Sequence, residues 1–234
     1  MQRTRPDDRL GAAASFVRQG AVFADIGTDH AHLPIFLLKS GRISRAVAAD
    51  VNQGPLDRAK ANAMSEGVAS RIDFRLADGL SGMDDLALTD IAICGMGGEL
   101  IASIIDRAAF LRDARIRLIL QPMTRTSVLR TYLAREGFRI EEEKIISAAS
   151  RVYVCMAVSY TGEAYSLSEA EAECGKELLC RVPNALERRY VTERLSAAKK
   201  KLKGRQSGGA HDSETESLAA LVAFYEDYLE VKKP

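Results

Sequence analysis

Apolar residues recur along the first 160 positions in two alternating patterns. Short, mostly continuous apolar runs predict strands that are covered on both faces of a sheet. Apolar residues at helical spacing lie between these runs, and Gly41, Gly67 and Gly137 stand just past the ends of three predicted helices. The predicted strands are 21–25, 45–50, 71–77, 90–95, 116–121, 138–146 and 152–160, and the predicted helices are 8–17, 31–40, 55–66, 98–106 and 125–136.

The order of these elements predicts the fold class. Strand and helix alternate through the first five strands, which is typical of a parallel, doubly wound α/β sheet. The last two strand patterns have no helix between them, so we expect an antiparallel pair at one edge of the sheet. Seven strands that end in such a pair resemble the Rossmann-like class I methyltransferase fold, an inference from fold alone.

The pattern changes after Gly162. The remaining residues are charged with sparse apolar positions, and they predict helices at 168–182, 183–204 and 213–231. Gly208 and Gly209 separate the last two helices, which we expect to pack as an antiparallel, coiled-coil hairpin. The predicted domains are therefore a catalytic domain, 1–162, and a helical domain, 163–234.

Composition narrows the class of protein. A chain of 234 residues with 47% hydrophobic residues, 33 basic and 32 acidic side chains can bury a full core. The charged first eight residues and the lack of a long apolar run favour neither secretion nor a membrane span, so we expect a cytoplasmic protein. The four cysteines and three histidines lack metal-ligand spacing, and we expect reduced thiols and no metal site. The sequence does not fix the oligomeric state; we expect a monomer or a weak dimer.

The segment 24–34 reads as a hinge between a strand and a helix. The apolar run ends at Asp25, passes Gly27, and opens into a helix. Such a hinge lies at the carboxyl edge of a doubly wound sheet, where backbone approaches a ligand closely. Asp29 and His30 stand where a dinucleotide fold needs further glycines, so a pyrophosphate would meet negative charge. The hinge suits a ligand with a cationic or hydroxylated part, such as S-adenosylmethionine.

Two more acidic residues close the next two strands. Asp50 lies 25 residues beyond Asp25, where a carboxylate accepts both hydroxyl protons of a ribose. Asp78, followed by Gly79, is placed to accept from an adenine amino group. A single Asp at a strand end often only caps a helix or forms a turn. Three at consecutive strand ends favour a ligand site.

The fourth strand ends in a glycine-rich segment, Gly95-Met96-Gly97-Gly98. Three glycines in four positions indicate backbone held close to a flat or bulky partner, and we expect cofactor and substrate to meet there. The alternative is a tight strand-to-helix turn with no ligand. Gln121 and Pro122, at the end of the fifth strand, offer an amide for a base edge, which is a weak signal.

The two C-terminal helices carry opposite charge. Residues 176–205 contain ten Lys or Arg and three Glu, whereas residues 212–234 contain six acids and two Lys. The basic helix has the charge to follow a phosphate backbone, or the two helices only neutralise each other. The candidate nucleic-acid contacts are Arg188, Arg189, Lys199, Lys200, Lys201 and Lys203.

The segment 25–34, the glycine-rich segment, the Gln121-Pro122 turn and the helical hairpin together resemble the bacterial tRNA (adenine-22-N1)-methyltransferase family over nearly the whole chain. The resemblance implies an S-adenosylmethionine-dependent enzyme whose coiled C-terminal domain helps to hold tRNA. It implies that Asp29, Met96, Gly97 and Gly98 face the target adenine. The cofactor residues that it implies are Arg9, Asp25, Gly27, Asp29, His30, Asp50, Asp78, Gly79 and Gly95. Met123 departs from the family, which typically has Asn there.

The chemistry expected of such an enzyme demands little from side chains. Adenine N1 keeps a lone pair at neutral pH, so positioning is the main contribution, and the base must leave its stack. Asp29 either favours the charge that develops on the base, or only orders the hinge or binds the cofactor. Two other classes stay open: a methyltransferase of another RNA, a small molecule or a protein, and a non-catalytic RNA-binding relative.

Overall fold

The computed structural model describes residues 8–209 and 212–232, so His211 lies outside the described residues. The chain divides into two compact units, Met1–Tyr165 and Ser166–Pro234. The first unit contains every strand among the described residues, and the second is helical.

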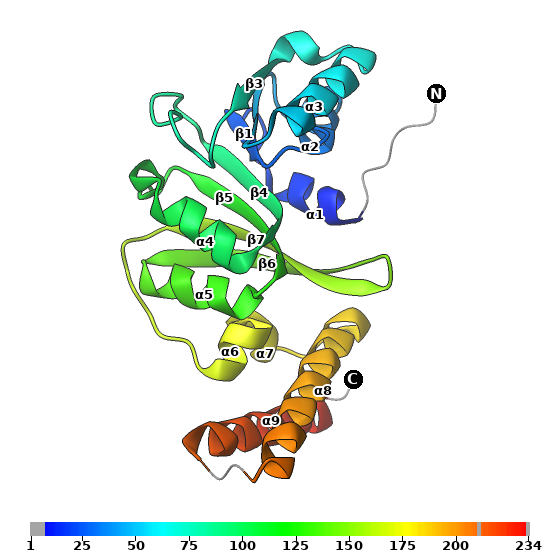
Figure 1. Cartoon of the computed structure of the whole chain (residues 1–234), viewed down its shortest axis with the longest axis vertical. Coiled ribbons are helices and arrows are strands. Elements are labelled where there is room, and N and C mark those ends of the chain that lie inside the picture. The colour runs from blue at the N-terminus through cyan, green and yellow to red at the C-terminus, as the bar shows by residue number, and fades with distance from the viewer. Residues whose placement is uncertain (1–7, 210–211, 233–234) are drawn as a thin grey trace. The chain divides into compact units, whose positions relative to one another are not determined.

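A seven-stranded sheet forms the centre of the first unit (Figure 1). The strands lie in the order β3-β2-β1-β4-β5-β7-β6, and β7 runs antiparallel to the other six strands. The predicted α/β class and the antiparallel final pair are therefore confirmed. The strands are β1 (Phe23–Ile26), β2 (Ala46–Asp50), β3 (Ile72–Leu76), β4 (Asp90–Gly97), β5 (Arg117–Thr124), β6 (Phe138–Ala148) and β7 (Arg151–Tyr160).

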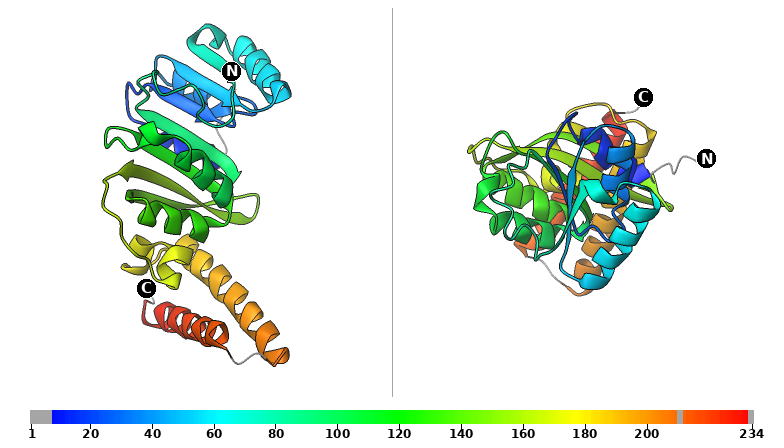
Figure 2. Two further views of the ribbon diagram at one scale, coloured as in Figure 1. Left: turned by 60° about the vertical axis from the view of Figure 1, so that its left-hand side comes forward. Right: turned by 90° about the horizontal axis from the view of Figure 1, so that it is seen from above.

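Helices cover both faces of this sheet (Figures 1 and 2). Right-handed crossovers place α2 and α3 on one face, because the chain moves from β1 outward to β3, and place α4 and α5 on the other face. The helix α1 packs beside α2 and against β5, β6 and β7. The helices are α1 (Asp8–Phe16), α2 (His32–Lys39), α3 (Gln53–Ser65), α4 (Gly98–Asp106) and α5 (Thr126–Arg135), with short 3₁₀ turns η1 (Ala69–Arg71) and η2 (Ala109–Leu111).

Burial explains the continuous apolar runs. Every residue of β1 is buried, as are the first four of β2 and of β4, because helices cover both faces of these central strands. The outermost strand β3 is less covered, and Leu76 is 59% exposed. The connection from β3 to β4, residues 77–89, contains no helix.

The strand β4 differs from its prediction at the glycine-rich segment. The sequence predicts that the strand ends at Gly95, but β4 continues to Gly97 beside a longer β5. Met96 pairs with Pro122 and Gly97 with Thr124, with irregular register on both sides of Met96. Bulges tolerate the positive φ of Gly95 and the missing N–H of Pro122. The segment is therefore an irregular strand extension rather than a turn.

The described residues of the second unit form four helices: α6 (Glu169–Cys174), α7 (Lys176–Leu179), α8 (Ala185–Ser207) and α9 (Ser213–Val231). The single helix expected over 168–182 is wrong, because Gly175 adopts φ 95° and breaks it into α6 and α7. Capping boxes begin α6 at Ser168 and α8 at Asn184. The Arg188 guanidinium, near the start of α8, donates to the Leu229 and Lys232 carbonyl oxygens at the end of α9. The two long helices therefore run antiparallel, as predicted.

Candidate active site

The strand ends bring three predicted acidic residues to one edge of the sheet. Asp25 lies in β1, Asp50 ends β2, and Asp78 follows β3. Strand order reverses between β1 and β4, because β1 connects outward to β2 and β4 connects outward to β5. Ligands of open α/β sheets bind outside the carboxyl ends of the strands at such a switch point. The structure thus places these carboxylates where the sequence predicts a cofactor site.

Asp25 is the most deeply buried of these acids, with 7% of its surface exposed. The Thr28 hydroxyl donates to its Oδ2 at 2.6 Å. Burial, opposed by the Thr28 hydrogen bond and reinforced by the charge of Asp50, raises the pKa of Asp25 to about 6. Sequence reasoning missed Thr28, although its position three residues after Asp25 in the hinge was the available signal.

Gly27 folds the hinge back over the end of β2. Its N–H and that of Thr28 donate to the Ala49 carbonyl oxygen at 2.8 and 3.0 Å. Gly27 has φ 77°, a conformation that disfavours residues with a Cβ. A Cβ built on Gly27 would lie 2.1 Å from the Met96 Cε, so the tip of the Met96 side chain covers this turn. The hinge and the end of β4 therefore meet at Gly27 and Met96.

Asp29 projects outward, and its side chain is 61% exposed. The Arg58 guanidinium from α3 donates to its Oδ1 at 2.7 Å and holds the pKa of Asp29 below its ordinary value. The His30 Nε2 lies 3.5 Å from the other oxygen, and the His30 ring stacks on His32 with centroids 5.4 Å apart. Sequence reasoning missed Arg58, because nothing in the pattern of α3 shows which helix residue reaches the hinge.

Asp50 and Asp78 differ in their partners. The Asp50 Oδ1 accepts from the Asn52 N–H at 2.8 Å, so Asp50 also forms the turn into α3. Both oxygens of Asp78 accept from the Arg107 guanidinium, at 2.6 and 3.1 Å, which lowers the pKa of Asp78. Among the residues described, Asp25 and Asp50 have no ion pair within 4.0 Å. Within the described part of the chain, these two carboxylates therefore differ from Asp78, which an arginine pairs.

A second group of side chains lies near the end of β5 and the start of β7. The Arg9 Nη1 is 3.5 Å from the Met123 sulfur, and its guanidinium stands 5.4 Å from the centre of the Tyr153 ring. Gln121 is 2% exposed, and its side-chain amide donates to the Pro122 carbonyl oxygen at 3.1 Å. Gln121 is therefore held inside the fold rather than offered to a base edge. Sequence reasoning missed Tyr153 as a partner of Arg9.

Packing explains part of the glycine-rich segment. A Cβ on Gly98 would lie 2.3 Å from the Arg125 carbonyl oxygen, and one on Gly97 would lie 3.3 Å from the Thr124 hydroxyl. A Cβ on Gly95 would meet nothing within 4 Å, although its φ is 81°. Gly98 thus permits a close approach of β4 to the start of α5, so the close partner expected for this glycine is protein backbone.

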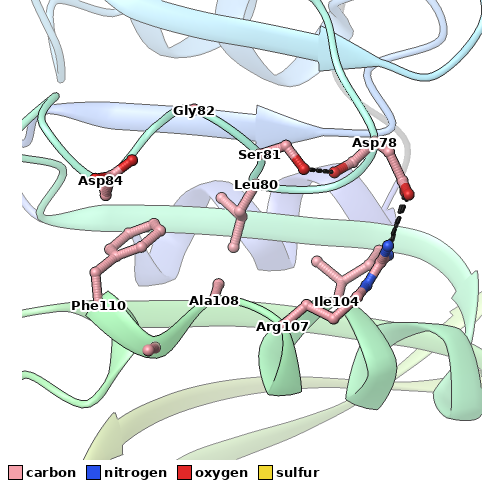
Figure 3. Close-up of a pocket in the computed structure, with 10 residues that line it drawn as sticks. Asp78, Leu80, Ser81, Gly82, Asp84, Ile104, Arg107, Ala108 and Phe110 are labelled. Atoms are coloured by element: carbon pink, nitrogen blue, oxygen red, sulfur yellow. Dashed lines mark hydrogen bonds and ion pairs between the residues drawn. The ribbon is translucent and has the colours of Figure 1, made fainter.

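A pocket of about 410 Å³ begins at Asp78 and runs beneath the loop 77–89 (Figure 3). Leu80, Ile104 and Phe110 give it apolar walls, and Arg107 lies at the same end as Asp78. Residues of β1 and β2 do not line it. Of the three strand-end carboxylates, Asp78 is the one that lines this pocket.

The candidate nucleic-acid contacts of α8 separate into two groups. Lys199 pairs with Glu226 at 2.6 Å and Lys201 with Glu214 at 3.0 Å, both across to α9. Arg188 caps the end of α9, and Arg189 pairs with Glu193 at 2.9 Å. Lys200 and Lys203 are exposed, and no carboxylate of the described residues lies within 4.0 Å of their ammonium groups. Neutralisation between the helices is therefore partial.

None of the helices in residues 8–209 and 212–232 combines the length and the hydropathy that a membrane span requires. No three His, Cys, Asp or Glu side chains of those residues are grouped so as to hold a metal ion.

A family model described as a methyltransferase domain matches residues 7–156. This match, the strand order and the acidic strand ends define the protein as an S-adenosylmethionine-dependent methyltransferase of class I. The tRNA (adenine(22)-N(1))-methyltransferase of Bacillus subtilis (strain 168) is 34% identical over 153 residues, which cover 65% of this chain and 64% of that protein. The chain belongs to the bacterial tRNA (adenine-22-N1)-methyltransferase family.

Two solved structures extend this likeness to nearly the whole chain. Streptococcus pneumoniae Sp1610, assigned as a tRNA (m1A22) methyltransferase and solved with S-adenosyl-L-methionine, is 34% identical with a TM-score of 0.79. The alignment covers 94% of this chain and 98% of Sp1610. The Bacillus subtilis m1A22 tRNA methyltransferase TrmK is 28% identical with a TM-score of 0.83, covering 98% of this chain and 99% of TrmK. The helical second unit is therefore shared with these relatives.

Proposed function

We propose that this protein transfers a methyl group from S-adenosylmethionine to N1 of adenine 22 in tRNA. The observation that carries the proposal is the pair of inner carboxylates, Asp25 and Asp50, at the topological switch point of a methyltransferase sheet. The likeness to the tRNA (adenine-22-N1)-methyltransferases supports tRNA as the substrate. We further propose that the protein acts in the cytoplasm as a monomer or a weak dimer.

The residues present fit this cofactor. Asp25 is buried and Asp50 is half-buried, and no arginine balances either of them among the residues described. Such a pair suits a ligand with positive charge and a ribose diol, whereas a pyrophosphate would be repelled. Asp78 is the acceptor for the adenine amino group, and Gly27 and Gly95 give close approach of backbone. Arg9, Asp29, His30 and Gly79 complete the proposed cofactor set.

S-adenosylmethionine, when bound, supplies a sulfonium-activated methyl group that adenine N1 takes with its lone pair, so no proton has to leave the base first. Asp29 stays ionised because Arg58 lowers its pKa. It is therefore suited to stabilise positive charge that develops on the base, and poorly suited to act as a general base. Met96, over the hinge, and the backbone at Gly97 and Gly98 are proposed to border the target adenine.

The second unit is proposed to bind the tRNA backbone through Lys200 and Lys203. Phosphate contacts of this kind position an RNA without reading its sequence. Because Gln121 is buried, other groups must contact the edge of the target base. An alternative contact is proposed for the group formed by Arg9, Met123 and Tyr153.

The test is transfer of labelled methyl to unmodified tRNA, with the product nucleoside identified by mass spectrometry. Labelled 1-methyladenosine is expected with tRNA that has adenine 22 and not with tRNA that has guanine there. Transfer to both tRNAs, or to neither, would contradict the proposal. Asp29→Ala is expected to lower turnover far more than cofactor affinity. Equal losses in turnover and affinity would contradict a role for Asp29 beside the reacting base.

A further inference from the structure

We infer that Arg107 is a positioning residue for the cofactor: it holds Asp78 in the orientation in which that carboxylate accepts the amino group of the cofactor's adenine. The inference rests on the proposed function, which places Asp78 in the cofactor site. It adds a residue outside the strand ends, because Arg107 is the C-cap residue of α4.

The ion pair between the two side chains fixes both oxygens of Asp78. The Arg107 Nη1 lies 2.6 Å from Oδ2 and Nη2 lies 3.1 Å from Oδ1, as Figure 3 shows for the pair at one end of the pocket. Two such bonds restrict rotation of a carboxylate that is otherwise 60% exposed. A carboxylate has about four lone-pair sites, so Asp78 can still accept from an amine. The guanidinium also lowers the pKa of Asp78 and keeps the acceptor ionised.

The helix α4 holds the neighbouring backbone as well. Ile104 lies one turn before Arg107, and a Cβ on Gly79 would approach its Cγ2 to 3.1 Å. Gly79 has φ 61°, so the chain turns sharply against this helix. The helix α4 begins at Gly98, so it follows the end of β4 directly. Through Ile104 and Arg107 it also contacts Gly79 and Asp78, which follow the end of β3.

The loop after Asp78 gives this carboxylate little other support. Residues 77–89 contain no helix that would fix Asp78 at its first turn. The loop is held by the Ser81 hydroxyl, which donates to the Asp78 carbonyl oxygen at 2.8 Å, and by the Arg75 Nη1, which donates to the Gly82 carbonyl oxygen at 3.0 Å. Both bonds restrain backbone. Among the described residues, only Arg107 forms an ion pair with the Asp78 side chain.

The test compares two ligands by calorimetry: S-adenosylhomocysteine, and its analogue with hydrogen in place of the 6-amino group. Arg107→Met is expected to weaken binding of S-adenosylhomocysteine about three- to tenfold, since Asp78 must then be ordered on binding. The affinity for the analogue is expected to change less than twofold, because the analogue has no amino group for Asp78 to accept. Arg115→Met is the matched control, since Arg115 forms a similar pair with Asp113, at 2.6 and 3.0 Å, before β5.

Unchanged or tighter binding of S-adenosylhomocysteine by Arg107→Met would overturn the inference, and so would equal losses for both ligands, which a merely structural role predicts. Failure of the unaltered protein to bind S-adenosylhomocysteine would instead overturn the proposed function. Thermal melting without ligand reports folding. Should Arg107→Met not fold, Arg107→Lys keeps the charge, and a selective loss for the amino-bearing ligand remains the required result.

Discussion

The tip of Met96 covers Gly27 so closely that a Cβ on Gly27 would lie 2.1 Å from the methionine Cε. This contact joins the hinge after β1 to the irregular end of β4. The Met96 side chain is flexible and can give way, whereas the backbone at Gly27, with φ 77°, cannot be relaxed in the same way. The two constraints on Gly27 are therefore separable by mutation.

Gly27→Ala is expected to weaken S-adenosylmethionine binding at least tenfold and to cost about 1–2 kcal/mol of folding stability from the left-handed backbone. Adding Met96→Ala removes the steric contact and leaves the backbone strain. The double variant should therefore regain stability only in part. Calorimetric binding and urea unfolding measure both effects, and full recovery in the double variant would show that the backbone conformation is unimportant.

Asp25 predicts a pH dependence of stability. Its pKa rises from 3.8 to about 6 on folding, so the native state holds the proton more tightly than the unfolded chain. The free energy of unfolding then falls as pH rises through this interval, and above pH 6 the full penalty persists. From these two pKa values the penalty grows by about 2 kcal/mol between pH 4.5 and pH 8.

Asp25→Asn removes that penalty and keeps an oxygen acceptor for Thr28. The variant's stability advantage over the unaltered protein should therefore grow by about 2 kcal/mol from pH 4.5 to pH 8, while its affinity for S-adenosylmethionine falls. Asp85→Asn, at an exposed position, is the control for the change in charge. Urea unfolding at the two pH values measures the difference in free energy of unfolding between Asp25→Asn and the unaltered protein. The same difference at both values would show that folding does not raise the pKa of Asp25.

Gly98 is expected to act through packing. A Cβ there would lie 2.3 Å from the Arg125 carbonyl oxygen and 3.2 Å from the Leu129 Cβ, and backbone cannot move aside cheaply. Gly98→Ala should therefore destabilise the protein by about 1–3 kcal/mol. Gly204→Ala, within α8 and with nothing within 4 Å, should leave stability unchanged or raise it by up to about 1 kcal/mol. Equal melting temperatures for the two variants would refute the packing explanation.

The lysines of α8 are expected to differ in their effect on tRNA. Lys200→Gln with Lys203→Gln should weaken tRNA binding and reduce the slope of log affinity against log salt by about 2, one for each lost phosphate contact. Lys199→Gln with Lys201→Gln removes the same charge from groups already paired with Glu226 and Glu214, so the change should be smaller. Identical slopes for the two double variants would show that the ion pairs with α9 do not determine which lysines contact the tRNA.

The sequence predicted the elements of the sheet because helices cover both faces of β1, β2 and β4, which produces continuous apolar runs. The acids at strand ends followed from topology, since parallel strands end at one edge. Arg58 and Arg107 could not be predicted, because each reaches its carboxylate from a helix 29 residues further along the chain. The role of Gly98 was also hidden, since the backbone it approaches belongs to α5.

Methylation of N1 of adenine 22 by this protein is tested most directly by reverse transcription. A methyl group on N1 lies on the base-pairing edge and arrests the polymerase. Unmodified tRNA incubated with this protein and S-adenosylmethionine is expected to give a new stop beside position 22, which should be lost when the cofactor is omitted. A stop at another adenine would contradict the assigned position. Full-length product from tRNA that has accepted the labelled methyl group would show that the methyl group is not on the base-pairing edge.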